Sequence, residues 1–446
     1  MTSKLVRKLH RRAGYAAVGV VAGLAACSDA ALAPVEPDAS DQRARAVIAC
    51  DPANGGISLP AGFCATVFAD LTTLPRHIVV RGNALFAATY DAPDGTPGGV
   101  VGLRDTDGDG HADQTSSFGS SQGNGIAWHK DWLYFAPHDR VERYVIDPAT
   151  LTPASGPELV IGGLPTTGDH ISKTIVIDRQ GMLYLNIGSA SNSCQVENRV
   201  LHSPGQDPCP ELPVRAGVWR FDARVLGQTQ ANGLHWGIGY RNMVALALAT
   251  RRQLLYGVQH GRDELHDNWP EHFAPEDQAS LPSEELVRID RGDHNGWPFC
   301  FHDPFQNKKV LAPEYGGDGQ IVGGCDRAEP PVLALPAHWA PNALHFYQGT
   351  LFPARYRGGA FIAFHGSHNI PTPLGQAGYN VVFVPFSGGA PLGGFEVFAD
   401  GFTGGGTPLP QNAAHRPTGL AEGEDGALYI SDDKGGRIWR VVWAGP

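Results

Sequence analysis

One short strand motif recurs six times along the chain, and this repetition constrains the fold more than any other feature. A copy contains an apolar strand, a turn with glycine, an aliphatic and aromatic strand, and in most copies a third strand. The copies span residues 78–87, 125–144, 174–222, 244–289, 342–384 and 418–441. One such unit cannot bury its own apolar faces, so the copies must pack against each other. The repeat predicts an all-β fold, a six-bladed β-propeller with four short strands in each blade.

Long insertions interrupt the repeat after Gly188, Gly261 and Trp297. Propeller loops of this kind gather on one face and form the walls of a pocket, so we expect long loops on the top face. A tandem of β-sandwiches is the alternative. It fits less well, because the repeated unit is one small meander and not a two-sheet pattern. No helix is expected beyond short turns in the loops.

The N-terminal region has the composition of an export signal. Basic residues precede a short apolar run at 16–24, and Leu24-Ala25-Ala26-Cys27 is typical of a lipoprotein cleavage site. An ordinary secretory signal with an incidental cysteine is the alternative. We therefore expect a signal peptide over 1–26, a disordered tether over 27–48 and the propeller domain over 49–446. The predicted product is an exported lipoprotein on the periplasmic side of the outer membrane, held to the membrane only by its lipid.

Six cysteines remain if Cys27 carries lipid. An even number of cysteines in an exported chain predicts disulfides. Each neighbouring pair brackets one loop-like segment, so we expect Cys50–Cys64, Cys194–Cys209 and Cys300–Cys325. The net charge of −11 and the lack of a long basic run argue against a nucleic-acid partner.

Residues 105–113 carry acidic side chains at alternate positions and contain two glycines. Hard oxygen ligands at this spacing can surround a calcium ion, as in the first half of an EF-hand loop. Ser116 stands where the bidentate glutamate of that loop is expected, so Asp113 would have to serve. A solvated hairpin tip is the alternative. The candidate metal residues of this loop are Asp105, Asp107, Asp109, His111 and Asp113.

Polar groups stand at the start of several blades, where the loops of a propeller converge. Asp169 and His170 precede the third copy, and a histidine beside a group that fixes its tautomer suits a general base. Arg241 and Asn242 precede the fourth copy; arginine binds carboxylates and developing oxyanions through its planar fork. Gln259, His260, Gly261 and Asp263 follow the next strand of that copy. The other candidates are Arg76 at the entry of the first blade, His365 and Arg416.

Taken together, these segments resemble the PQQ-dependent sugar dehydrogenases, in particular their sorbosone dehydrogenase-like branch. The resemblance runs from about residue 59 to 442. Its most specific parts are Gly168-Asp169-His170, Tyr240-Arg241-Asn242, Gly261-Arg262-Asp263-Glu264-Leu265, Asn295-Gly296-Trp297-Pro298, Phe364-His365-Gly366-Ser367 and the segment from Asp432 to Arg440.

The resemblance implies a six-bladed propeller that binds PQQ on its top face. It implies that His170 removes the hydroxyl proton of a small sugar while hydride passes to the quinone, with Asp169 and Arg241 also catalytic. Calcium, held by backbone carbonyls near His260 and Gly261, would polarise the quinone as a Lewis acid. The implied cofactor-binding residues are Arg76, Lys173, Arg241, Asn242, Gln259, Asp263, His365 and Arg416.

The chain departs from this family at several positions. Lys173 stands where relatives commonly have arginine, which keeps the charge and loses the fork. His368, Asn369 and Ile370 stand where relatives often have Trp, Asn and Arg, and Trp339 stands where they often have Ser. These changes concern cofactor affinity and sugar specificity more than the fold.

Two other functions stay open at this stage. The scaffold could be a non-enzymatic ligand-binding propeller, or a calcium-dependent hydrolase or lactonase, although no clear acid cluster for the latter is seen at the pocket. No haem-attachment motif is present. A dehydrogenase would therefore need a separate electron acceptor, a cytochrome or a quinone.

Overall fold

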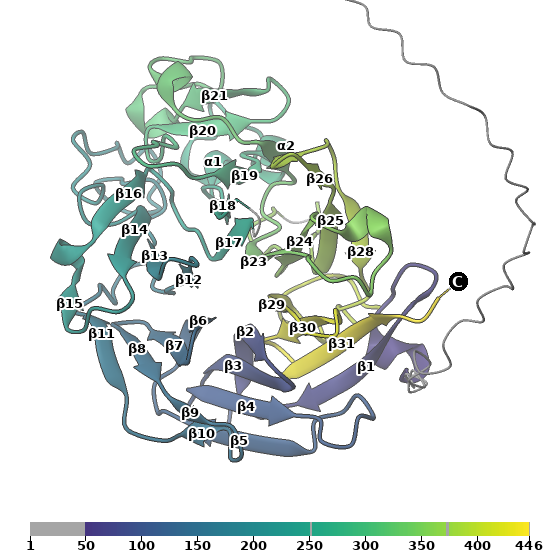
Figure 1. Cartoon of the computed structure of the whole chain (residues 1–446). Helices are drawn as coiled ribbons and strands as arrows, with labels where there is room; N and C mark the ends of the chain where they lie inside the picture. The colour runs from purple at the N-terminus through teal and green to yellow at the C-terminus, as the bar shows by residue number, and fades with distance from the viewer. Residues whose placement is uncertain (1–49, 250–251, 372–373, 446) are drawn as a thin grey trace, which may run out of the picture. The chain divides into compact units, whose positions relative to one another are not determined.

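The computed structural model describes residues 50–249, 252–371 and 374–445, which belong to one compact unit, Ala46–Pro446. Its strands form six four-stranded antiparallel blades arranged in a ring (Figure 1), as the repeat predicted. The first strands of successive blades contact one another around the whole circle, so the ring is closed. The signal peptide and tether expected over 1–26 and 27–48 lie outside the described residues.

The blades follow the chain order, with one exception. Blade 1 is β2 (Leu74–Arg81), β3 (Ala84–Tyr90), β4 (Val100–Arg104) and β5 (Gln114–Phe118); blade 2 is β6 (Gly123–His129), β7 (Trp132–Pro137), β8 (Val141–Tyr144) and β11 (Glu158–Gly162), with β15 (Gln228–Thr229) at its edge. Blade 3 is β12 (Ile175–Ile177), β13 (Met182–Ile187), β14 (Gly217–Asp222) and β16 (Leu234–Ile238); blade 4 is β17 (Ala245–Ala249), β18 (Leu254–Gln259), β19 (Glu284–Arg288) and β22 (Leu333–Leu335). Blade 5 is β23 (Pro341–Phe346), β24 (Ala360–Phe364), β25 (Asn380–Val384) and β28 (Glu396–Ala399); blade 6 is β29 (Pro417–Glu422), β30 (Leu428–Asp432), β31 (Arg437–Trp443) and β1 (Phe63–Asp70).

The exception is β1, which comes from the N-terminal end of the propeller and forms the outer strand of the last blade. It pairs antiparallel with β31, from Phe63 opposite Trp443 to Asp70 opposite Arg437. The two ends of the chain thus complete one sheet, where the purple and yellow strands lie side by side in Figure 1. The six-copy motif did not predict this pairing.

The core lies between neighbouring blades. All five residues of β24, of β25 and of β30 are buried, because each of these strands has another blade on both of its faces. Aromatic side chains fill the space between blades 5 and 6, where Phe361, Phe383 and Tyr356 pack with Phe398. Burial on both faces explains why these strands read as continuous apolar runs.

The small elements outside the blades are short. They include the hairpins β9–β10 (Ile146–Asp147, Thr152–Pro153), β20–β21 (Cys300–Asp303, Lys308–Leu311) and β26–β27 (Phe386–Ser387, Ala390–Pro391), the helices α1 (Leu265–Asn268) and α2 (Pro275–Ser280), and the 3₁₀ turns η1 (Pro52–Gly56), η2 (Gln230–Asn232), η3 (Pro313–Tyr315), η4 (Cys325–Arg327) and η5 (Ala354–Tyr356). No helix of the described chain is both long and apolar enough to cross a membrane.

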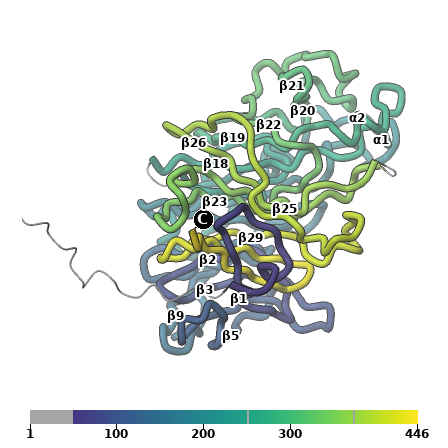
Figure 2. Tube along the Cα trace, turned by 90° about the vertical axis from the view of Figure 1, so that its right-hand side faces the viewer, coloured from purple at the N-terminus to yellow at the C-terminus, as the bar shows by residue number. Residues whose placement is uncertain are grey.

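The strands alternate in direction, so the start of each first strand and the end of each second strand lie at the same end of the ring. We call this end the site face. Insertions at 188–216 and 260–283 leave it directly, and α1 and α2 lie to one side of β18 and β19 in Figure 2. The insertion at 289–332 starts at the other end and returns along blade 3, where His294 bridges Ile238 and the amide of Trp297 donates to Gly239 O.

Three disulfides fasten these peripheral segments. They are Cys50–Cys64 beside β1, Cys194–Cys209 in the insertion of blade 3 and Cys300–Cys325 in the long insertion of blade 4. The predicted pairing of neighbouring cysteines is confirmed.

Candidate active site

A cavity of about 340 Å³ lies at the site face between blades 3, 4 and 5. Its volume is within the range of small-molecule pockets. Charged groups and histidines dominate its wall, and none of the described lining residues is phenylalanine, tyrosine or tryptophan. The lining residues are Asp169, His170, Arg199, Arg241, His260, Gly261, Asp263, Glu284, His338, Ala340, His368 and Asn369. Six residues that the sequence analysis selected therefore lie together: Asp169, His170, Arg241, His260, Gly261 and Asp263.

His170 is held in one tautomer by Ser189. Its Nδ1 lies 3.0 Å from the carbonyl oxygen of Ser189 and 2.9 Å from the hydroxyl oxygen, which itself donates to Ser191 O at 2.6 Å. A carbonyl oxygen only accepts, so Nδ1 carries the proton. Nε2 is then the basic nitrogen, and it has no hydrogen-bond partner within the described part of the chain.

The charge state of His170 also suits a base. Burial, reinforced by the positive charge of Arg241, holds the pKa of the imidazole well below its usual value of 6.5. The ring is therefore neutral near pH 7 and can accept a proton at Nε2.

Asp169 stands next to His170 in the sequence, which predicted that it fixes the tautomer of the histidine, but its carboxylate contacts other residues. Its carboxylate pairs with Arg199 Nε at 3.0 Å and receives a long contact of 3.3 Å from Asn198 Nδ2. The hydrogen bond that orients His170 comes from Ser189, which follows β13, the second strand of the blade. The sequence analysis missed Ser189 and Arg199, which both lie in the insertion that follows Gly188.

Arg241 is buried and fully anchored. Its Nε donates to Asn192 O at 3.0 Å, Nη1 to Gly261 O at 2.8 Å and Nη2 to Asp263 Oδ2 at 2.8 Å. Burial alone would raise the pKa of the Asp263 carboxyl, but Arg241, His338 and Arg199 together hold it well below its usual range. A guanidinium fixed in this way is a preorganised positive charge.

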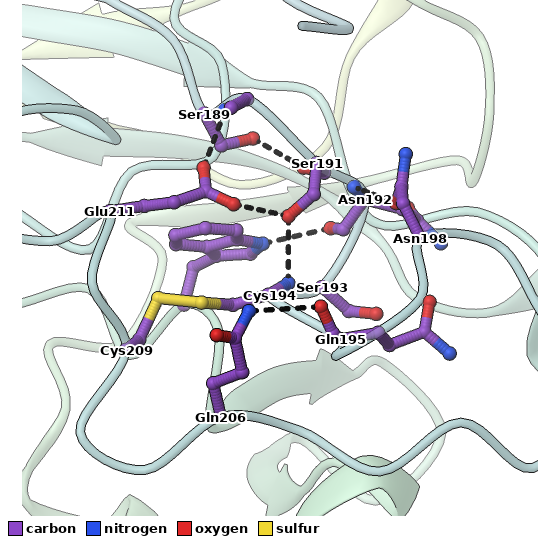
Figure 3. Close-up of a disulfide and its surroundings, with 12 residues drawn as sticks. Ser189, Ser191, Asn192, Ser193, Cys194, Gln195, Asn198, Gln206, Cys209 and Glu211 are labelled. Atoms are coloured by element: carbon purple, nitrogen blue, oxygen red, sulfur yellow. Dashed lines mark hydrogen bonds between the residues drawn. A yellow bond between two sulfur atoms is a disulfide. The ribbon is translucent and has the colours of Figure 1, made fainter.

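The insertion of blade 3 supplies the anchor of Arg241. Figure 3 shows the backbone of this loop beside the Cys194–Cys209 disulfide. The amide of Asn192 donates to Asn198 Oδ1 at 2.9 Å, and the amide of Cys194 donates to Ser191 Oγ at 3.0 Å. Trp297, buried in the long insertion of blade 4, donates from Nε1 to Asn192 O at 2.9 Å. Trp297 thus packs beneath the site and does not line the cavity.

Two of the predicted cofactor residues lie beneath the cavity wall. Gln259 Oε1 accepts the backbone amide of Arg241 at 2.8 Å, and its Nε2 donates to Glu285 at 3.2 Å. Asn242 Oδ1 receives Asn186 Nδ2 at 3.4 Å. Both side chains are buried and fix the segment that carries Arg241.

The expected calcium position near His260 and Gly261 is engaged by other groups. The Gly261 carbonyl accepts Nη1 of Arg241, and His260 Nε2 lies 2.8 Å from Pro341 O. A divalent cation on the Gly261 oxygen would lie next to a guanidinium, which like-charge repulsion opposes. An ion on the Gly261 oxygen would therefore require this guanidinium to move.

A second group of predicted residues surrounds Asp433, where blades 1, 5 and 6 meet. Arg76 Nη1 and His365 Nε2 both contact the Asp433 carboxylate, the latter at 2.6 Å. Arg416 donates to the carbonyls of His365 and Gly366 at 2.9 and 2.7 Å. Burial lowers the pKa of His365. Asp432, which is fully buried, accepts the backbone amide of Arg416, so two arginines and two carboxylates meet in this group.

The departures from the family pattern have distinct positions. Lys173 is buried and donates to the carbonyls of Pro165 and Ile171 at 2.9 and 2.6 Å, and burial lowers its pKa to about 7. Asn369 donates to Asp263 inside the cavity, and His368 forms part of its wall. Trp339 packs edge-on against Phe364 and Phe395, away from the cavity lining.

The acidic loop at 105–113 joins β4 to β5 and lies at the end of the ring opposite the site face. Carboxylate oxygens of Asp105, Asp107 and Asp109 all lie within 4.8 Å of one another. The other two predicted ligands do not join this group. His111 Nδ1 lies 2.8 Å from Val67 O, and the Asp113 carboxylate accepts Thr106 Oγ1 at 2.5 Å. These competing hydrogen bonds hold both side chains in place.

Comparison with known proteins shows the family of the chain and the solved structures that its fold resembles. The model of the TrAA12-like family matches residues 57–444. A structure of the carbohydrate-active AA12 enzyme of Trichoderma reesei superposes with a TM-score of 0.69 at 19% identity, covering 87% of this chain and 98% of that one. The holo PQQ domain of pyranose dehydrogenase from Coprinopsis cinerea gives 0.68 at 21% identity, covering 86% and 97%. At these identities the likeness is one of fold.

One curated relative matches the chain over part of its length. An uncharacterized protein of Borreliella burgdorferi is 29% identical over 206 residues, which is 46% of this chain and 48% of the relative. The chain thus spans about half the length of that relative.

Proposed function

The chain belongs to the TrAA12-like family, whose structural neighbours are PQQ-dependent sugar dehydrogenases, and on this premise we propose that it oxidises an aldose sugar with bound PQQ. One observation of the site carries the proposal. A neutral, partly buried histidine in the wall of a charged cavity has an unprotonated Nε2, while Ser189 holds the other nitrogen in its protonated form.

The residues of the site face fit an anionic quinone. PQQ carries three carboxylates, and the site face holds Arg199 and Arg241 in the cavity wall, with Arg76 on Asp433 and Arg416 on the carbonyls of His365 and Gly366 nearby. When bound, PQQ supplies the quinone carbon that accepts a hydride. Arg241 would hold and polarise it from a fixed position, and Arg76 and Arg416 would balance the charge of its carboxylates.

The chain's own part in the reaction is to take the proton. A sugar hydroxyl within hydrogen-bond reach of His170 Nε2 can pass its proton to that atom as its carbon gives up hydride. The imidazolium that forms keeps its Nδ1–H bond to Ser189 O. The positive charge of Arg241 disfavours that imidazolium, which limits how long the proton stays and favours its later release.

Dye reduction by the purified protein, measured over a panel of aldoses with and without added PQQ, tests this function. We expect reduction only when both a sugar and PQQ are present. Reduction that persists without PQQ, or a calorimetric titration that shows no PQQ binding, would contradict the proposal.

Calcium stays a prediction for this site. Because Arg241 already donates to the Gly261 carbonyl, an ion there requires that guanidinium to move when the cofactor binds. Activity measured after chelation and after calcium is restored tests the requirement. The same assay on Asp107→Asn tells whether any effect comes from the acidic loop on the opposite end of the ring.

The place of the reaction and its electron acceptor are proposed on sequence alone. The lipoprotein signal over 1–26 and the lipid on Cys27 would put sugar oxidation on the periplasmic side of the outer membrane, with a cytochrome or quinone receiving the electrons. Labelled fatty acid that is incorporated into the wild type and not into Cys27→Ser would support the anchor. Equal labelling of the two would contradict it.

A further inference from the structure

The turn that follows β13 carries the atoms that orient His170. Nδ1 of His170 lies 3.0 Å from Ser189 O and 2.9 Å from Ser189 Oγ. A hydroxyl group can donate or accept, so by itself it does not decide the tautomer of the ring. Here it donates to Ser191 O at 2.6 Å and is left to accept from Nδ1. The tautomer of His170 thus depends on how the peptide units of residues 189–191 are oriented.

Glu211 holds this turn on the side away from His170. Its carboxylate accepts the backbone amide of Ala190 through one oxygen and the hydroxyl of Ser191 through the other. Figure 3 shows both bonds as dashed lines from the Glu211 carboxylate. The hydroxyl oxygen of Ser191 also accepts the amide of Cys194 at 3.0 Å. The carboxylate therefore fixes two consecutive residues of the turn.

The charge of Glu211 is not used in an ion pair within the described part of the chain. Arg215, in the same insertion, directs its guanidinium to the carbonyl and hydroxyl oxygens of Thr167. Both oxygens of Glu211 instead bind neutral donors, a backbone amide and a hydroxyl group. A partly buried carboxylate that serves only one turn indicates a role in that turn.

One peptide unit separates Glu211 from His170. Ser189 O and the N–H of Ala190 belong to the same planar trans peptide, whose C=O and N–H point in opposite directions. Glu211 therefore binds one edge of this unit while His170 binds the other. A negative charge on the N–H edge also polarises the unit, which makes the carbonyl oxygen a stronger acceptor. The next peptide is fixed separately, because Ala190 O accepts the amide of Asp169 at 2.9 Å.

We propose that Glu211 is a positioning residue for the base, holding the Ser189–Ala190 peptide so that Nδ1 of His170 keeps its proton and Nε2 its lone pair. The inference rests on the proposed function. Without Glu211, the peptide and Ser191 are free to turn, and the hydroxyl of Ser189 can then donate to Nδ1. The proton of the neutral ring would move to Nε2, where it blocks uptake of the substrate proton.

The tautomer can be measured directly, by long-range proton–nitrogen NMR correlation on the cofactor-free full chain with isotopically labelled histidine at neutral pH. His170→Ala identifies the signals of this ring. In the wild type we expect the proton on Nδ1. Glu211→Ala should shift the signals to the Nε2–H form or to an average of the two forms. Glu211→Gln keeps an oxygen for the amide of Ala190 and should keep the wild-type tautomer.

Turnover of the PQQ-loaded protein should follow the tautomer. Loss of the group that orients a catalytic residue costs about 10- to 100-fold, so we expect kcat of Glu211→Ala to fall by that factor. Glu211→Gln should recover most of this loss. KM should change little, because Arg241 keeps its bonds to Asn192 O and Asp263.

Glu197→Ala is the matched control. Glu197 is an exposed carboxylate of the same disulfide-closed insertion, and only its backbone amide is bonded, to Ser203 Oγ. Its loss removes the same charge from the same loop without touching the turn. Both the tautomer of His170 and kcat should equal those of the wild type.

Thermal unfolding identifies a variant that does not fold. Glu211→Asp, one methylene too short to reach both donors, should match Glu211→Ala and takes its place in that case. An unchanged tautomer or an unchanged kcat in the folded variant would overturn the inference, as would a wild type protonated on Nε2. Absence of dye reduction by the wild type would count against the proposed function alone, because the NMR measurement needs neither PQQ nor sugar.

Discussion

At the scale of single residues, Ser189 determines which nitrogen of His170 acts as the base. Its carbonyl can only accept, so the proton is placed on Nδ1 and the lone pair of Nε2 is left for the substrate. A carboxylate partner in the same position would have raised the pKa of the ring. The neutral carbonyl lets burial and Arg241 lower it instead.

Replacing His170 by alanine should abolish most of the turnover. General-base catalysis contributes about 10²- to 10⁴-fold, so we expect kcat to fall by about 10³-fold. PQQ affinity, measured by calorimetry, and the melting temperature should change little. The exposed His272→Ala serves as control, and turnover retained in His170→Ala would exclude the histidine as base.

The pH profile should reflect the same lowered pKa. The base works unprotonated, so activity is lost as pH falls through the pKa of His170. Because that pKa lies well below 6.5, kcat/KM should stay level as the pH is lowered past 6.5 and fall only in more acidic buffer. An acid limb with its midpoint at or above pH 6.5 would show that burial does not act on this group as described.

The sequence predicted the cavity residues that come just before the first strand or just after the second strand of a blade. Asp169, His170, Arg241 and Asp263 belong to segments with a fixed position in the repeat or a marked family motif, and the structure brings them to one cavity. Ser189 and Arg199 could not be found in this way. They lie in an insertion without a repeat, and their partners depend on how that loop folds back over the blade.

At the scale of elements, the insertions after the second strands of blades 3 and 4 build the cavity. The blades place the anchoring backbone, and the insertions supply Asn192, Arg199 and Asp263. The Cys194–Cys209 disulfide closes the first of these loops. A small cross-linked loop thus positions both Arg241, through Asn192, and the outer wall, through Arg199.

Removing this disulfide should affect both stability and substrate binding. A closed loop of this length, with a sequence separation of 15, is worth about 3 kcal/mol in the chain-entropy model. We expect Cys194→Ser with Cys209→Ser to lower the free energy of unfolding by about that amount and to raise KM. Denaturant titration and steady-state kinetics measure the two effects.

The Cys50–Cys64 pair is the matched control for that prediction. It closes a loop of similar length beside β1, away from the cavity. Its double serine variant should lose comparable stability and keep its KM. An equal rise of KM in both double variants would show that the first disulfide has no special part in the site.

At the scale of the whole molecule, the repeat predicted six blades, and the structure has six. The outer strands were harder to predict, because they are short and partly exposed; β5, for example, reads Gln-Thr-Ser-Ser-Phe and has no buried residue. The closure of the ring by β1 could not be predicted from the sequence, because β1 and β31 lie about 370 residues apart and no motif marks either strand as the partner of the other. Patterns of burial reveal inner strands, whereas edge pairing depends on the completed ring.

Partly buried, neutral histidines should make the folded protein sensitive to acid. Burial lowers the pKa values of His77, His235 and His260 from 6.5 to about 4. In the unfolded chain these histidines become protonated near pH 6.5, whereas in the folded state they stay neutral until about pH 4. The free energy of unfolding should therefore fall as the pH is lowered from about 6.5 to 4, the window in which only the unfolded state is protonated.

Denaturant unfolding at a series of pH values checks this expectation. The free energy of unfolding should change most steeply with pH between pH 6 and 4, with a slope on the order of several protons. His77→Gln should reduce that slope by about one proton. A free energy of unfolding that does not change over this window would contradict the neutral state of these rings.

The seam between β1 and β31 also has a mechanical consequence. Phe63 lies opposite Trp443, so the two ends of the chain leave the sheet at the same corner. A force that pulls the ends apart loads the paired residues one after another and not all at once, so the strand should peel away at low force. The Cys50–Cys64 disulfide passes such a force from Cys50 directly to Cys64, which lies opposite Val442, so Phe63 stands in a closed loop that carries no load. Its aromatic contacts with Phe352, Tyr356, Phe398 and Trp443 therefore keep that corner of the sheet in place while the backbone pairs of β1 open from Cys64 onward.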